Sequence, residues 1–234
     1  MTKEYGRAYK SPHGFAVKNI NKIIGLLNQT YPKALTTSLF FKNPFELLIS
    51  TILAAQSTDK LVNKVTPALF QKYKDPQSFA DADLVELQDD IRQTGFFRNK
   101  SISIIKCSKD IIEKFDGKVP DNIEDLINLH GVGRKTANVV LANAFGKQGI
   151  IVDTHMLRIS KLIGLTVNKD PVKVEFDLRK IIPEDNWINF SHKIVEHGRS
   201  LCIARRPKCE ICPVSEYCRY YNMDINEKTM TRYK

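Results

Sequence analysis

The sequence lacks the features of a membrane or exported protein. Its 234 residues contain no run of about eighteen apolar residues, which is close to the minimum for a transmembrane helix. Residues 1–10 are polar and charged, with no apolar segment behind them, and this excludes a secretory signal. We therefore expect an intracellular, cytoplasmic protein without a membrane partner.

Internal repeats, low-complexity tracts and flexible linkers are missing as well. The length allows one domain or two small ones with a real hydrophobic core. Hydrophobic residues make up 42% of the chain, somewhat below the globular average of roughly 45–50%. The one β-like stretch, residues 150–152, is too short to build a sheet.

Helical signals recur along the whole chain. Apolar residues three and four positions apart predict an amphipathic helix over 17–30. Asn43 and Pro44 are typical of a helix start, and the apolar run 45–55 that follows should be buried on most sides. Asp59 is expected to cap the helix after it. The fold class is therefore all-α, with further helices predicted over 83–94, 100–115, 121–129, 134–145, 154–162, 171–182 and 189–201.

The charge balance is strongly basic. The chain has 36 Lys and Arg against 26 Asp and Glu, a net charge of +10. Such an excess attracts polyanions and speeds association with nucleic acid. A basic protein whose charge only prevents aggregation would show the same balance, so charge alone leaves both interpretations open.

The segment 121–143 has the pattern of two helices joined by a tight turn. The turn contains Gly131 and Gly133, and the second helix begins with Arg134 and Lys135. Two glycines one residue apart let the backbone turn sharply and approach a ligand closely. Their amides and the start of the next helix form a positive concavity suited to one phosphate. An ordinary helix–helix turn has similar glycines, but the adjacent cations favour a phosphate site that positions DNA without reading its sequence.

Four of the five cysteines fall within seventeen residues, whereas Cys107 stands apart and is expected to be a buried, small apolar residue. Without a secretory signal, such a group indicates a metal site rather than disulfides. Four thiolates suit either tetrahedral zinc or a 4Fe–4S cluster. Zinc sites more often pair two Cys-x-x-Cys motifs, and only one occurs here. The grouped residues are Cys202, Cys209, Cys212 and Cys218.

The segment 129–137, Leu-His-Gly-Val-Gly-Arg-Lys-Thr-Ala, resembles the helix-hairpin-helix of the endonuclease III family of DNA glycosylases. The resemblance extends from Phe45 to Cys218, and the cysteine spacing is that of the family's iron–sulfur site. It therefore implies a 4Fe–4S cluster rather than zinc. One position departs from the family, which usually has proline where this chain has His130, and the loss of that restriction would loosen the hairpin slightly.

The resemblance implies a catalytic lysine at Lys135 and a catalytic aspartate at Asp153. An amine attacks a sugar carbon only when it is deprotonated, and the positive end of a helix and neighbouring Arg134 both disfavour an ammonium ion. Without the resemblance, the spacing favours a solvated lysine that meets phosphate as a point charge. Asp153 is also a candidate helix cap, and one carboxylate can both cap a helix and take part in catalysis. His155 matches a family position too, with either DNA contact or backbone support as its role.

Further DNA contacts follow from the same resemblance. Gln56 would fill the gap left by an extruded base, and Phe96 would wedge between bases of the opposite strand. Helix capping by Gln56 and core packing by Phe96 are the structural alternatives. A cluster held by the four cysteines would fix the basic loop 203–208 and present Arg205, Arg206 and Lys208 to phosphates.

The resemblance also implies two helical domains that flank a DNA-binding cleft. A six-helix domain with the hairpin is expected over 37–147, and an iron–sulfur domain over 15–36 with 148–234. Residues 1–14 and the tail after Asn222 are expected to be loosely held. The implied protein is a monomeric, nucleoid-associated enzyme that removes oxidised pyrimidines from double-stranded DNA and nicks abasic sites. Two other hypotheses are a non-catalytic DNA-binding module and a glycosylase that releases a base without nicking.

Overall fold

The computed structural model describes residues 14–34 and 36–223, and within these ranges it contains helices and no strand, which confirms the all-α prediction. The contacts divide the chain into two compact units. We call Thr37–Gly149 the hairpin unit, and Met1–Thr36 with Ile150–Lys234 the cysteine unit. The expected boundary after residue 147 and the observed one after Gly149 differ by two residues. The expectations for residues 1–13 and 224–234 lie outside the described residues.

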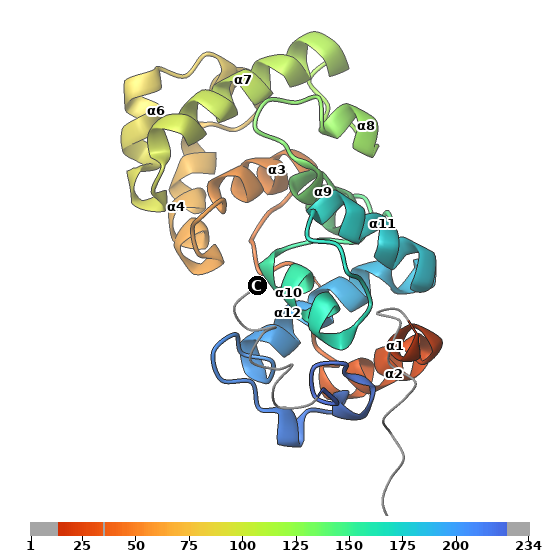
Figure 1. Cartoon of the computed structure of the whole chain (residues 1–234). Helices are drawn as coiled ribbons and strands as arrows, with labels where there is room; N and C mark the ends of the chain where they lie inside the picture. Colours follow the sequence, from red (N-terminus) through yellow and green to blue (C-terminus); the bar gives the residue numbers. More distant parts are fainter. Residues whose placement is uncertain (1–13, 35, 224–234) are drawn as a thin grey trace, which may run out of the picture. The chain divides into compact units, whose positions relative to one another are not determined.

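The hairpin unit is built around α3, most of whose residues are buried apolar side chains. This helix packs against α4, α7 and α9, while α5 and α6 pack against α7 (Figure 1). Asn43 caps α3 by accepting a hydrogen bond from the backbone N–H of Glu46 at 2.9 Å, and Pro44 is its first residue. The helices are α3 (Pro44–Leu53), α4 (Asp59–Lys72), α5 (Pro76–Ala80), α6 (Leu84–Asp90), η1 (Arg92–Thr94), α7 (Phe97–Phe115), α8 (Ile123–Leu126) and α9 (Arg134–Ala144).

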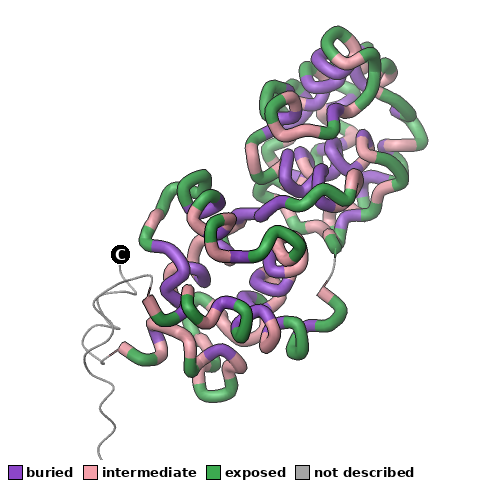
Figure 2. Tube along the Cα trace, turned by 90° about the vertical axis from the view of Figure 1, so that its right-hand side faces the viewer, coloured by how far each residue is buried: buried purple, intermediate pink, exposed green. Residues whose placement is uncertain are grey.

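The cysteine unit joins the N-terminal helices to the C-terminal third of the chain. Helix α12 packs against α2 and α10, and their apolar faces form one buried core. Figure 2 shows the buried parts of the chain in purple. Three cysteines, Cys202, Cys212 and Cys218, pack against this core. The helices are α1 (Phe15–Lys18), α2 (Ile20–Thr30), α10 (Thr154–Ile163), α11 (Pro171–Ile181), η2 (Glu184–Asn186), α12 (Trp187–Ser200), η3 (Cys209–Ile211) and η4 (Ser215–Tyr217).

Several predicted helix boundaries were wrong. The helix expected over 17–30 is interrupted at Asn19, whose side chain donates to the carbonyl oxygen of Phe15 at 2.9 Å. Thr58 caps α4, and Asp59 is its first residue rather than its cap. The hairpin unit also contains α5, which was not predicted, so it has seven α-helices instead of six.

None of the helices in the described part of the chain combines the length and apolar character that a membrane span requires.

Candidate functional site

The hairpin turn packs closely against α7 because Gly131 has no side chain. This residue has a φ of 75°, which disfavours any residue with a Cβ atom. A Cβ added there would also lie 2.8 Å from the Cβ of Ser103 in α7. Leu129 and Val132, on either side, are buried. Gly131 is therefore needed for both the conformation of the turn and its packing.

Gly133 has a different role, because it is the N-cap of α9 with an extended φ of −91° and open space where a Cβ would lie. No side chain caps this helix, and its first backbone bond runs from the N–H of Ala137 to the carbonyl of Gly133 at 2.9 Å. The N–H groups of the first turn thus face space that an anion can enter. Helix N-termini with this arrangement bind phosphate.

His130, where the resemblance implies proline, ties the turn to α7. Its backbone N–H and its Nδ1 lie 3.0 and 2.8 Å from Oδ2 of Asp110. Burial opposes ionisation of Asp110, but hydrogen bonds from Lys114 and His130 outweigh it and hold the pKa of this carboxyl below its usual value. Proline has no N–H to donate, so this tether depends on the departure from the family pattern.

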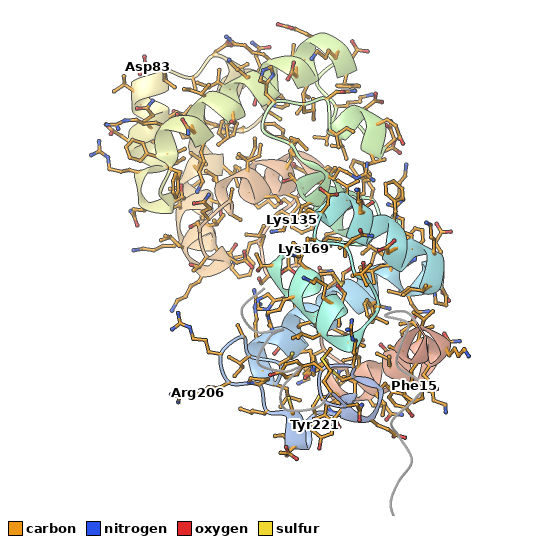
Figure 3. The ribbon with its side chains drawn as sticks, in the orientation of Figure 1. Phe15, Asp83, Lys135, Lys169, Arg206 and Tyr221 are labelled. Atoms are coloured by element: carbon orange, nitrogen blue, oxygen red, sulfur yellow. The ribbon has the colours of Figure 1, made fainter. Side chains whose placement is uncertain are left out.

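Lys135 is exposed in the first turn of α9 (Figure 3). The opposite face of this helix, including Ala137, Val140 and Leu141, is buried, and the helix packs against α3. The amine is therefore carried by a rigid helix start directly after the open amides of the turn. This is the environment expected for a nucleophile beside a bound phosphate.

Asp153 is the N-cap of α10 in the cysteine unit. Its Oδ1 accepts a hydrogen bond from the backbone N–H of Met156 at 2.7 Å. Buried Ile151 and Val152 precede it and fix the chain at the helix start. Asp153 therefore does cap this helix. The cap uses only Oδ1 of its carboxylate, and Oδ2 is left for a role in catalysis.

His155 supports the packing of α10 on α12. A Cβ added at Gly198 of α12 would lie 2.3 Å from Nδ1 of His155, so the imidazole rests directly against the backbone of that glycine. This geometry favours the support role for His155. Gly198 was not identified from the sequence, since nothing near it in the chain indicates that a ring packs there.

Gln56 and Phe96 share an unusual backbone conformation. Their φ angles are 54° and 50°, and among the described residues only Asp116 is another non-glycine residue with positive φ. Such strain is found preferentially at functional sites. Phe96 is 62% exposed, which rules out core packing as its role, and Gln56 is exposed beyond the end of α3 at Leu53.

Lys100 connects the two loops that carry these residues. It is buried, and its ammonium donates to the carbonyl oxygens of Leu53 and Thr94 at 2.7 and 2.8 Å. Leu53 is the last residue of α3 and Thr94 is the last of η1. Burial lowers the pKa of Lys100. The residue was missed from the sequence because both acceptors are backbone groups, one of them 47 residues away.

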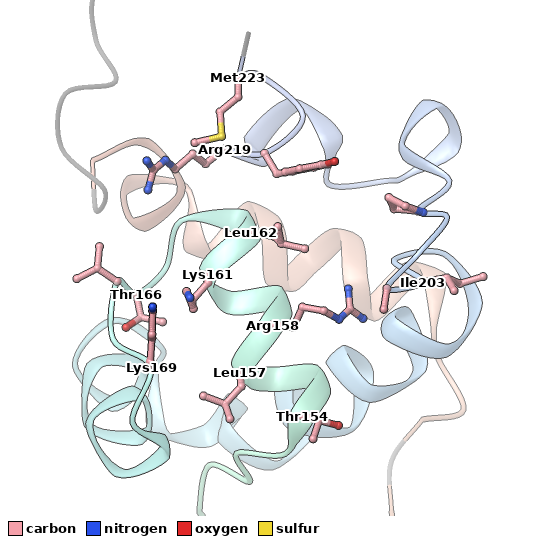
Figure 4. Close-up of a pocket in the computed structure, with 14 residues that line it drawn as sticks. Thr154, Leu157, Arg158, Lys161, Leu162, Thr166, Lys169, Ile203, Arg219 and Met223 are labelled. Carbon is pink, nitrogen blue, oxygen red and sulfur yellow. The ribbon is translucent and has the colours of Figure 1, made fainter. Parts of the chain in front are cut away.

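A pocket of about 650 Å³ lies beside α10 within the cysteine unit (Figure 4). Four cations line it, and no Asp or Glu is among the described residues that do so. Its apolar wall includes Leu157 and Ile203. Excess positive charge around a concave site suits phosphate groups. The cations are Arg158, Lys161, Lys169 and Arg219.

The four grouped cysteines line a single cavity, and none of them forms a disulfide. Burial raises the pKa of Cys212 to about 11 and that of Cys218 to about 12. No set of three or more ligand side chains among the described residues is arranged to hold one metal ion. Four free thiols around one cavity are the donor set that a 4Fe–4S cluster takes.

The basic loop 203–208 is fastened at its ends next to this cavity. The backbone N–H of Lys208 donates to Leu201 at 2.9 Å, and Arg158 donates to the carbonyl oxygen of Cys202 at 2.6 Å. The side chains of Arg205, Arg206 and Lys208 are exposed, as Figure 3 shows for Arg206. Cys107, by contrast, is fully buried in α7, and burial raises its pKa to about 12.

Comparison with known proteins identifies relatives over nearly the whole chain. Residues 49–184 match the HhH-GPD superfamily of base excision DNA repair proteins, and 202–218 match the iron-sulfur binding domain of endonuclease III. The chain is 50% identical to endonuclease III of Synechocystis sp. over 84% of this chain and 90% of the relative. For endonuclease III of Bacillus subtilis the identity is 44%, over 87% and 93%. A solved structure of a trapped endonuclease III–DNA covalent intermediate is 40% identical, with a TM-score of 0.83, over 93% of this chain and 99% of that one.

Proposed function

The chain belongs to the endonuclease III family and is a base excision DNA glycosylase with AP lyase activity, and we propose that Lys135 is the nucleophile for both reactions. It also carries the iron–sulfur domain of the family, with a 4Fe–4S cluster as cofactor. The observation that supports the proposal is the position of Lys135, which is exposed in the first turn of α9, two residues after Gly133, an N-cap without a side chain.

In the proposed reaction the neutral Nζ of Lys135 attacks C1′ of the damaged nucleotide. The bond from C1′ to the base breaks, and the base leaves with the bonding electrons. The amine then loses a proton and the C1′–O4′ bond breaks, with O4′ taking up a proton, which leaves a protonated Schiff base between Nζ and C1′. Loss of a proton from C2′ then expels the 3′ phosphate by β-elimination and nicks the strand. Asp153 stabilises positive charge that develops on the sugar or accepts a proton. The two proposed residues are supplied by different units.

The remaining residues of the proposal bind and distort the DNA. The amides around Gly131 and Gly133 hold one phosphate, with Arg134 beside them. Gln56 fills the space vacated by an extruded base, and Phe96 wedges between bases of the opposite strand. Extrusion of the base costs a few kcal/mol of stacking and pairing. His155 keeps α10 in place. We expect double-stranded DNA to be the partner, which associates the protein with the nucleoid, and we expect it to act as a monomer.

The cysteine unit adds a second set of phosphate contacts. We propose that Cys202, Cys209, Cys212 and Cys218 bind the 4Fe–4S cluster, whose chemistry here is to fix the chain around it. Arg205, Arg206 and Lys208 then face phosphates. The pocket beside α10 extends this surface through Lys161, Lys169 and Arg219.

Trapping with borohydride tests the nucleophile. The iron-loaded protein is mixed with duplex DNA that contains an abasic site or thymine glycol, because we propose oxidised pyrimidines as substrates. We expect a covalent adduct with the native chain and a loss of adduct and nicking of at least about 10³-fold in Lys135→Ala. The control is Lys106→Ala, which removes an exposed lysine of α7.

The outcomes separate the three hypotheses. A native chain that binds damaged duplex but never forms an adduct is a binding module. A chain that releases the base without nicking is a monofunctional glycosylase. Adduct and nicking that persist in Lys135→Ala, with its iron content unchanged, reject Lys135 as the nucleophile.

A further inference from the structure

Tyr31 lies against one face of α12, at the point where α2 ends. Lys193 donates to its carbonyl oxygen at 3.3 Å, and Ser200 donates to its hydroxyl at 3.2 Å. Between them, Nδ1 of His197 lies 2.9 Å from the hydroxyl oxygen of Tyr31. Residues 193, 197 and 200 are spaced so that they share one helix face. Tyr31 thus has a fixed place in the cysteine unit.

His197 connects this tyrosine to the cysteine cavity. Its imidazole is buried, and Nε2 lies 3.7 Å from Sγ of Cys212, within hydrogen-bond distance for sulfur. The rings of Tyr31 and His197 meet edge to face, with centroids 5.8 Å apart. A continuous path therefore runs from the hydroxyl of Tyr31, the residue that follows α2, to a sulfur on the cavity wall.

The direction of the hydrogen bonds follows from the groups available. A thiolate that binds iron can only accept, whereas a neutral imidazole carries one N–H and one acceptor nitrogen. When the Tyr31 hydroxyl donates to Nδ1, the ring proton is on Nε2 and points at Cys212. A ring with both protons would donate to the sulfur as well. Only an Nδ1–H tautomer would not donate to the sulfur, and it would require the Tyr31 hydroxyl to accept from Nδ1 in addition to the hydrogen bond that it accepts from Ser200.

We propose that His197 donates a hydrogen bond to the cluster ligand Cys212 and thereby raises the midpoint potential of the cluster, with Tyr31 as the residue that sets the imidazole tautomer. A donor beside a ligand sulfur stabilises the additional negative charge of the reduced state. The proposal rests on the assignment of Cys212 as a ligand, but it does not depend on the chemistry of Lys135.

Voltammetry of the iron-loaded protein, without substrate, tests the proposal. His197→Leu removes the donor, and we expect a lower midpoint potential. His197→Gln keeps an N–H near the sulfur and should restore most of the difference. Tyr31→Phe keeps the packing but removes the hydroxyl, so a smaller fall is expected. Tyr73→Phe, which deletes a hydroxyl bonded to Asp90 in the hairpin unit, is the matched control and should leave the potential unchanged.

Iron content separates the possible failures. Loss of iron in Cys212→Ser supports Cys212 as a ligand, and full iron content there overturns both that assignment and the proposal. Full iron content with an unchanged midpoint potential in His197→Leu overturns the proposed hydrogen bond from His197 and leaves Cys212 as a cluster ligand. If His197→Leu does not retain iron, Tyr31→Phe becomes the deciding variant. A midpoint potential in Tyr31→Phe equal to that of the native chain then rejects the proposal.

Discussion

The side-chain nitrogen of Lys100 lies 2.7 Å from the carbonyl oxygen of Leu53, the last residue of α3. The same nitrogen lies 2.8 Å from the carbonyl oxygen of Thr94. Gln56 follows the first carbonyl by three residues, and Phe96 follows the second by two. One buried cation therefore restrains both strained loops, so that each keeps its place relative to the other.

Replacing Lys100 should separate these loops. Lys100→Met removes the donor and leaves two buried carbonyl groups without it, so we expect a loss of about 2–4 kcal/mol in the free energy of unfolding. Weaker binding of damaged duplex should accompany it, because Gln56 and Phe96 lose their common support. Urea unfolding and duplex titrations measure both effects. Lys106→Met on the exposed face of α7 should stay within about 0.5 kcal/mol, and equal stability of the two variants would contradict the role of Lys100.

The two hairpin glycines should respond in opposite ways to alanine. Gly131→Ala forces a left-handed conformation on alanine and a collision with Ser103, at a cost of about 2 kcal/mol or more. Gly133→Ala has room for its methyl group, so the cost should stay below about 1 kcal/mol. Its DNA affinity should nevertheless fall, because the methyl group occupies space that a phosphate would approach. Unfolding and binding curves for both variants check this, and a Gly133→Ala protein with unchanged affinity would argue against the phosphate site.

Restoring the proline that the family usually has at position 130 should destabilise this chain. His130→Pro removes both the backbone N–H and the imidazole that hold Asp110, and we expect a loss of about 1–3 kcal/mol. His130→Asn keeps the backbone donor and should lose less. Chemical denaturation of the two variants compares them directly. A more stable His130→Pro protein would show that the rigidity of proline outweighs the tether.

Mild acid should weaken the fold through His192. Burial, and secondly the charge of Lys193, lower its pKa below 6.5, and its buried Nε2 has no hydrogen-bond partner among the described residues. As the pH falls below about 6.5, the unfolded chain binds a proton that the folded chain resists, so the free energy of unfolding falls. Above that pH, His192 is neutral in both states and its contribution to the free energy of unfolding is fully present. Urea unfolding at several pH values between 7.5 and 5 gives the dependence of the free energy of unfolding on pH. This dependence should be weaker in His192→Gln than in the native chain, and an unchanged dependence would assign the effect to other groups.

Local signals were enough to predict most helices of this chain. Asn43 and Pro44 mark the start of α3 because a cap and a preset φ act within a few residues. The interruption at Asn19 was missed because a side-chain bond to Phe15 competes with an intact apolar stripe. Helix α5 was missed because five residues give almost no periodicity.

The candidate site divides in the same way. Gly131 and Gly133 stood out from the sequence, but their different roles depend on Ser103, which only the folded chain brings to the turn. Lys100 and Gly198 were missed because their partners lie far away in the sequence, at Leu53 and His155. Sequence patterns identify residues that act on their neighbours, whereas long-range contacts need coordinates.

The pairing of α2 with α12 has a consequence for synthesis of the protein. Tyr31 is separated from His197 by 166 residues, so at about 5–20 residues per second the first helices emerge roughly 8–33 s before their partner. The continuous segment Thr37–Gly149 can fold during that interval. Until α12 is synthesised, the apolar face of α2 that packs on it stays uncovered, so we expect chaperones that bind apolar segments to act on α2 during synthesis.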